Sequence, residues 1–65
     1  MKVRYGKGVD AAYIRFSSKR PQGAIEIDEG VILHVTEENK IVALEVLDAS
    51  ECFPIRNLFT LEVAE

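Results

Sequence analysis

The sequence predicts an α+β protein that is mainly β: a small antiparallel sheet of five to six strands with one short C-terminal helix. Two apolar-rich, β-branched runs, residues 31–36 and 41–47, flank a polar link at residues 37–40, which is the pattern of a β-hairpin. Shorter segments upstream alternate polar and apolar residues with the period of a strand. Residues 48–51 then carry the chemistry of a helix start.

The N-terminal part predicts a first hairpin. Residues 2–5 alternate polar and apolar side chains, which is typical of a short strand, and the glycine-containing residues 6–8 break it. A second strand is predicted over residues 10–16. Its side chains divide between two faces: Ala12, Ile14 and Phe16 on one, and Ala11, Tyr13 and Arg15 on the other.

Three more strands are predicted after a loop: residues 24–28, 31–36 and 41–47. Gly30 supplies a positive φ angle in the turn before the second of them. The last strand is apolar on one full face and partly on the other, whereas a half-buried antiparallel strand alternates more cleanly. We therefore expect it to be central, or its second face to meet the C-terminal segment or another subunit. The predicted core residues are Ile27, Leu33, Leu44 and Val46.

The C-terminal segment favours a short helix near residues 50–58, followed by a final strand over residues 59–63. Asp48 or Ser50 can cap the first helical turn, and Pro54 limits any helix that begins there. The alternative is that residues 59–63 are helical, because apolar residues of the same segment could also share one helical face.

The size of the chain bounds its architecture. Its 65 residues predict a single small β-rich domain, residues 1–65, with a thin stability margin. One cysteine and one histidine exclude an intrachain disulfide and a Cys/His zinc cluster. Oligomerisation or a protein partner is therefore the expected source of support, and no cofactor is predicted.

Charge and hydropathy narrow the expected partners. The net charge of −3 argues against general nucleic-acid binding, which needs a basic surface. No apolar run approaches the roughly 20 residues that span a bilayer, so no membrane association is expected. The charged N-terminus is unlike a signal peptide, and a cytoplasmic protein with a reduced thiol is the simplest interpretation.

Four segments carry a resemblance to a known family. They are Tyr5, residues 10–16, residues 28–31 and residues 43–50, with the patterns Asp-x-x-Tyr-Ile and Glu-x-x-Asp-Ala-Ser. Together they resemble a widespread family of small prokaryotic proteins that is catalogued as a domain of unknown function, number twenty-two eighty-three. The resemblance covers residues 2–52 and implies a small antiparallel β fold that ends in a helical turn. It implies no activity.

The sequence departs from the family pattern in two places. Residues 37–40 read Glu-Glu-Asn-Lys, where the resemblance leads us to expect an Asp/Gly-rich turn. His34 stands at a position that is often acidic in similar sequences. The resemblance therefore supports no role for an acidic cluster at this turn. The tail from Phe53 onward lies beyond the segment that matches the family pattern best.

No catalytic, cofactor-binding or metal-binding residue is predicted. His34 could be a general base or a metal ligand, but a lone histidine lacks activating partners, and a solvated strand position is the simpler interpretation. Cys52 could be a nucleophile in a first helical turn, but the neighbouring Phe53 favours a buried structural thiol. The scattered carboxylates could form an acid–base pair only if folding joined two of them, and turn or cap roles explain them more simply.

Two groups of residues are candidates for partner binding. Tyr13 and Arg15 share a strand face, with the basic residues 19–20 just beyond, and could bind RNA or an acidic peptide or form an ordinary solvated face. The C-terminal segment is strongly apolar, so we expect it to be an assembly element; the alternative is that it folds back on its own sheet. The candidate residues are Tyr13, Arg15, Leu58, Phe59, Leu61 and Val63.

The expected function is a protein-interaction module, either a homo-oligomer such as a homodimer or the companion subunit of another small protein. Short size and available sheet edges favour this class. The alternative is a minimal enzyme, or a homo-oligomer that binds a small ligand at its subunit interface.

Overall fold

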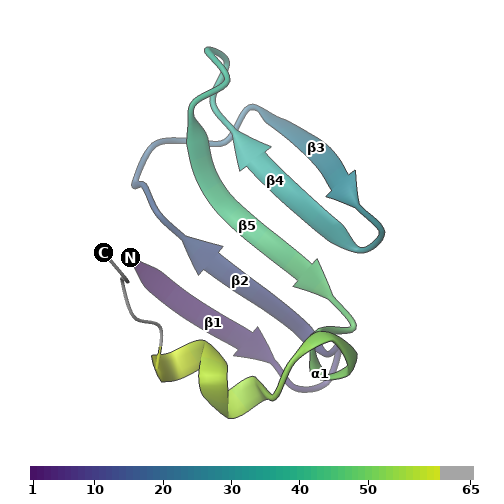
Figure 1. The fold of residues 1–65 in the computed structure, drawn as a ribbon. Coiled ribbons are helices and arrows are strands. Elements are labelled where there is room, and N and C mark those ends of the chain that lie inside the picture. The colour runs from purple at the N-terminus through teal and green to yellow at the C-terminus, as the bar shows by residue number, and fades with distance from the viewer. Residues whose placement is uncertain (61–65) are drawn as a thin grey trace, which may run out of the picture.

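A five-stranded antiparallel sheet with two short helical segments forms the fold of the computed structural model, which describes residues 1–60 (Figure 1). The strand order is β1-β2-β5-β4-β3. The strands are β1 (Lys2–Gly6), β2 (Ala11–Arg15), β3 (Gly23–Asp28), β4 (Val31–Val35) and β5 (Ile41–Leu47). All five predicted strands are therefore confirmed, as is the mainly β fold class with a small helical part.

β5 is the central strand, as its two apolar faces predicted. It pairs with β2 on one side and with β4 on the other, so neither of its edges is free. Val42 and Ala43 are fully buried and Val46 is nearly so, although they point to different faces of the sheet. A strand bonded along both edges is shielded by its neighbours, so apolar residues on either of its faces can be buried.

Local turn chemistry sets the register of the hairpins. Gly30 has a φ angle of 73° and accepts a hydrogen bond from the Leu47 N–H at 2.7 Å, which confirms the predicted turn. The link between β4 and β5 uses Asn39 at a φ angle of 64°. There the Thr36 hydroxyl oxygen accepts hydrogen bonds from the N–H groups of Glu38 and Lys40. The polar tetrapeptide therefore closes a hairpin without a glycine.

The C-terminal segment forms α1 (Ala49–Cys52) and the 3-10 helix η1 (Ile55–Thr60). Asp48 occupies the N-cap position in a left-handed conformation, but its side chain makes no capping hydrogen bond, so the predicted cap is wrong. The Asn57 N–H donates to the Pro54 carbonyl at 3.0 Å, which shows that Pro54 opens the second turn.

The predicted final strand over residues 59–63 is wrong for the part that the structure describes. Phe59 and Thr60 end η1 instead. The physical reason is Leu58, which is only 3% exposed and joins the core from a helical turn. Residues 61–63 lie outside the described residues.

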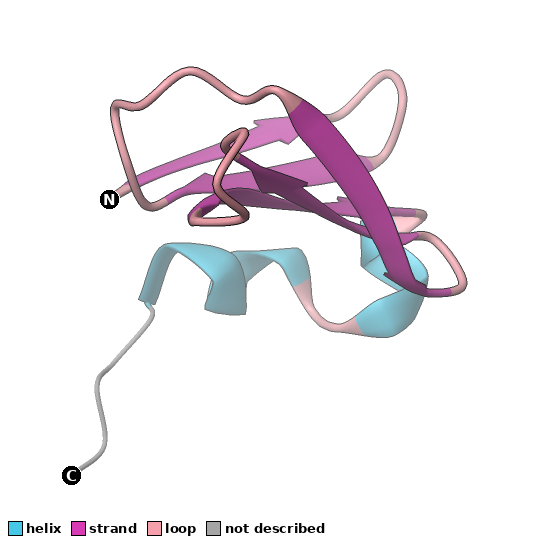
Figure 2. Ribbon diagram, turned by 90° about the horizontal axis from the view of Figure 1, so that it is seen from above, coloured by secondary structure: helices cyan, strands magenta, loops and turns pink. Residues whose placement is uncertain are grey.

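Both helical segments lie on one face of the sheet (Figure 2). The core cluster there consists of Ala12, Val46, Ala49 and Leu58, with Val3, Tyr5, Ile14, Phe53 and Ile55 packed against it. The helical segments thus cover the β1–β2 half of this face, which leaves the β3 side less protected. Of the four predicted core residues, Val46 is buried, and Leu33 and Leu44 are half-buried. The prediction that Ile27 belongs to the core is wrong, because its side chain is 56% exposed.

Replacing Leu58 with alanine should lower the free energy of unfolding by about 2–5 kcal/mol, because the side chain leaves a cavity in the core. Urea denaturation followed by far-UV circular dichroism measures the change. The matched control is Phe59→Ala, since Phe59 is the next residue and is 60% exposed; its effect should stay within about 0.5 kcal/mol. Equal losses for both variants would contradict the placement of η1.

Candidate functional site

The face of the sheet opposite the helices is called the open face (Figure 2). Lys2 pairs with Arg15 and Arg4 pairs with Tyr13 across the β1–β2 ladder. Cross-strand partners point to the same face, so these four side chains project together. Their neighbours Val3 and Ile14 point the other way, into the core under the helices.

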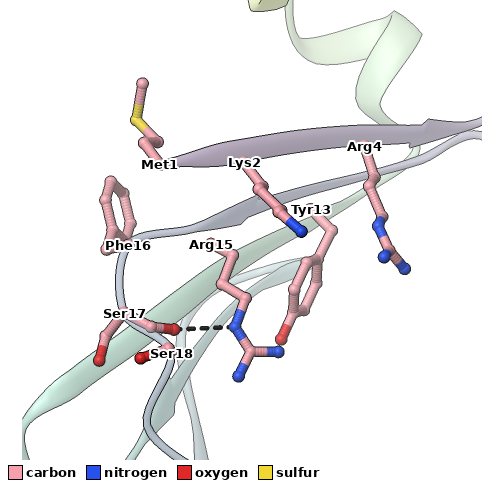
Figure 3. Close-up of a pocket in the computed structure, with 8 residues that line it drawn as sticks. All are labelled: Met1, Lys2, Arg4, Tyr13, Arg15, Phe16, Ser17 and Ser18. Carbon is pink, nitrogen blue, oxygen red and sulfur yellow. Dashed lines mark hydrogen bonds between the residues drawn. The ribbon is translucent and has the colours of Figure 1, made fainter.

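A pocket of about 400 Å³ lies on the open face at the β1–β2 end, and we call it the cationic pocket (Figure 3). The side chains of Lys2, Arg4, Tyr13 and Arg15 extend from the two strands in the same direction in Figure 3. Ser17 and Ser18 line the pocket from the loop that follows β2. No acidic side chain lines it, so three cations converge on one site in a chain whose net charge is −3.

Arg15 is held in place by backbone carbonyls. Its Nε donates to the Ser17 carbonyl oxygen at 2.8 Å, and one terminal nitrogen donates to the Lys19 carbonyl oxygen at 3.1 Å. A guanidinium has five N–H donors, so these two bonds leave donors for a ligand. The contacts fix the cation before any ligand arrives, which reduces the entropy lost on binding.

Tyr13 connects the cationic pocket to a histidine–carboxylate pair further across the open face. The rings of Tyr13 and His34 lie with centroids 5.6 Å apart and planes tilted by 52°. His34 Nε2 lies 3.0 Å from Glu45 Oε1. The prediction of a solvated histidine is therefore wrong in part, because His34 is only 21% exposed and has a carboxylate partner.

The His34–Glu45 pair does not make a metal centre. Within residues 1–60, no group of three or more histidine, cysteine or acidic side chains is placed to hold a metal ion. One histidine with one carboxylate can exchange a proton or bind a polar group. Nothing among the described contacts supplies a nucleophile beside it.

A second polar cluster lies at the other end of β1 and β2. Asp10 accepts hydrogen bonds from the Tyr5 hydroxyl at 2.6 Å, the Ser50 hydroxyl at 2.6 Å and the Ser50 N–H at 3.1 Å. Its own carbonyl oxygen accepts a hydrogen bond from the Ala49 N–H. Asp10 therefore anchors the first turn of α1 from a position 40 residues away in the sequence, which is the capping role that Asp48 and Ser50 do not perform.

The hydrogen bonds set the ionisation of this cluster. The bonds from Ser50, then that from Tyr5, lower the pKa of Asp10, because they favour the charged carboxylate. The hydrogen bond from Tyr5 to Asp10 raises the pKa of Tyr5, because losing the phenolic proton would break this bond and leave two negative charges in contact. The Ser50 hydroxyl donates to the Asp10 carboxylate, whose lowered pKa makes it a poor proton acceptor, and the cluster acts as a structural brace between α1 and the β1–β2 hairpin.

The structure brings together only some of the predicted partner-binding residues. Tyr13 and Arg15 meet in the cationic pocket. Leu58 is buried in the chain's own core and is not presented to a partner, whereas Phe59 is exposed. The alternative in which the tail covers its own sheet thus holds for Leu58, and Leu61 and Val63 lie outside the described residues.

Sequence reasoning missed the contribution of Lys2 and Arg4 to the cationic pocket. A sequence signal for it existed, because the short connection over residues 7–10 fixes the β1–β2 register and so brings these cations beside Tyr13 and Arg15. The link from Asp10 to Ser50 had no local signal. Cys52 is exposed, so the prediction of a buried thiol is wrong: it is the last residue of the short α1, whose one buried residue is Ala49.

Comparison with known protein families gives one match. The family model described as "Protein of unknown function (DUF2283)" matches residues 2–50, which is most of the chain. No curated protein and no solved structure matches. The matched segment contains the three cations and Tyr13 of the cationic pocket, the His34–Glu45 pair and the whole Asp10 cluster.

The lowered pKa of Asp10 predicts a specific acid sensitivity. Its charged form stabilises the folded state fully above the unfolded pKa, near 3.8, and this contribution is lost as the pH falls through the lower folded pKa. In urea denaturation, Asp10→Asn should therefore destabilise the protein at about pH 6 and should lose less stability than the wild type between about pH 5 and pH 3. Asp48→Asn is the matched control, and the same pH dependence in both variants would contradict this assignment.

The exposed thiol of Cys52 should react with a disulfide reagent in the folded protein at a rate similar to that in urea, because no packing shields it. The release of the coloured thiolate measures both rates. The variant Cys52→Ser should show no reaction and an unchanged melting temperature. Strong protection of the native thiol would place Cys52 in an interface or in the core.

Proposed function

The chain belongs to the DUF2283 family of proteins of unknown function, and we propose that it is a protein-interaction module whose open face binds an acidic segment of a partner chain. The cationic pocket is the single observation that carries this proposal. Its three cations and Tyr13 converge, no acidic side chain lines the pocket, and one cation is fixed by two carbonyl groups.

The chemistry of the pocket favours carboxylates on an extended segment. Arginine binds carboxylates through paired hydrogen bonds, and tyrosine and arginine are frequent at the centres of protein interfaces. The pocket volume lies within the range of about 300–1,000 Å³ that suits a small ligand or a few side chains. Because it opens on a sheet face, a partner segment can continue across Tyr13 toward His34, whose side chain is 21% exposed.

The partner is either a second copy, which would make a homodimer, or another small protein that this chain accompanies. The chain has no intrachain disulfide and only a small core, and short domains of this kind usually gain stability from a partner. A cytoplasmic location belongs to the same proposal, because an exposed free thiol suits a reducing compartment. No helix within residues 1–60 is long and apolar enough to cross a membrane.

Fluorescence anisotropy with a labelled oligoglutamate peptide at low salt tests the proposal. Arg4→Glu should weaken binding by about fivefold to tenfold, because it removes one cation of the pocket and adds a repelling charge. Affinity should also fall as salt rises. The melting temperature of the variant should stay close to that of the wild type, since Arg4 is exposed and lies outside the core.

The matched control is Lys40→Glu, which makes the same change of charge at the exposed turn between β4 and β5, away from the pocket. It should weaken peptide binding by less than about twofold at moderate salt. Equal losses in Arg4→Glu and Lys40→Glu would mean that only overall charge attracts the peptide, and the proposed site would then be wrong.

A further inference from the structure

We infer that the free edge of β3 is a second docking site, which accepts an extended segment in which basic residues alternate with apolar ones. The inference goes beyond the proposed function, because it concerns the edge of the sheet farthest from the cationic pocket and a partner of opposite charge. It rests on the exposure of β3, on the charges along it and on a pocket beside it.

The backbone of β3 is available for pairing. β3 is the terminal strand of the sheet and bonds only to β4 within the described residues (Figure 1). All six of its residues are exposed, including Ile25 at 46% and Ile27 at 56%. Natural edge strands are usually protected by lysine, proline or a bulge. β3 has only the last of these, a register shift between Glu26 and Asp28, so its first four residues form a regular edge.

The charge of this edge selects the partner. Between Gly23 and Glu29 the chain carries Glu26, Asp28 and Glu29 and no basic residue. Two copies that joined through their β3 edges would bring these like charges together, which destabilises strand pairing. A strand that carries lysine or arginine would instead meet complementary charge. The electrostatics therefore favour a basic segment over a second β3.

A pocket beside the first half of β3 gives the site a place for a side chain. It has a volume of about 500 Å³ and lies between the start of β3 and the turn after β4. Ile25 and Val35 supply apolar surface, Thr36 and Glu37 supply polar oxygen atoms, and no cation lines it. A side chain with an apolar stem and a positive end, such as lysine, matches this lining.

These features together define β-strand addition. In this mode the backbone hydrogen bonds of the edge provide affinity, and alternate side chains provide specificity. Here Ile25 would contact the apolar positions of the added segment, whereas Glu26 and the pocket would contact its basic positions. The bulge after Glu26 limits the added strand to a short length.

Titration of isotope-labelled protein with a short peptide of alternating lysine and valine tests the inference by nuclear magnetic resonance. The largest shifts should fall on the amides of Gly23 to Glu26 and of residues 35–37 that line the pocket. Glu26→Lys should weaken binding by about fivefold or more, because it reverses a contacting charge. The matched control Glu51→Lys changes an exposed charge on α1 and should leave the affinity within about twofold.

Two further measurements separate strand addition from other outcomes. A peptide N-methylated at alternate residues keeps its charge but cannot form the ladder, so it should not bind. Equal binding of this peptide, or shifts centred on other elements, would overturn the inference. Sedimentation that shows the free protein to associate through β3 would also overturn it, since a second copy would then be the occupant. Arg4→Glu should leave lysine–valine binding unchanged, so failure of the cationic pocket and failure of this edge are distinguishable.

Discussion

The antiparallel pairing of β2 with β5 is the interaction on which the rest of the structure depends. It joins the β1–β2 hairpin to the sheet formed by β3, β4 and β5, which follow the hairpin in the chain after the loop over residues 16–22. It also makes β5 central, so that Val42, Ala43 and Val46 are buried without any help from a partner. A chain this small can stabilise a sheet only if its most apolar strand lies in the middle.

The same pairing gives the sheet two different faces. On one face, small side chains such as Ala12 and Ala49 allow the short helical segments to approach closely, and Asp10 anchors the first turn of α1 across the end of the hairpin. On the other face, Ala43 lies between Arg15 and His34 in neighbouring strands, and it is fully buried beside these larger side chains. The polar residues therefore project from paired strands of the sheet, and regular elements position a binding site more precisely than loops do.

Charge is distributed across the sheet in a way that its composition conceals. The net charge of −3 is small, but the edge strand β1 carries Lys2 and Arg4, whereas the edge strand β3 carries Glu26 and Asp28. These edges lie at opposite ends of a five-stranded sheet. Like charges on each edge oppose pairing with the same edge of another copy, so both edges resist uncontrolled association and prefer partners of complementary charge.

The sequence by itself determined the strands, because period-2 alternation and turn residues such as Gly30 are local signals that the sheet does not override. It also indicated a central β5 and placed Tyr13 and Arg15 on one strand face, as the register confirms. Only the tertiary structure decided which strands are neighbours, and with that the approach of Asp10 to Ser50 and of His34 to Glu45. Burial was likewise a tertiary outcome. Leu58 is covered by the sheet, whereas Ile27 is exposed because the helical segments shield only part of one face, and no local pattern records this difference.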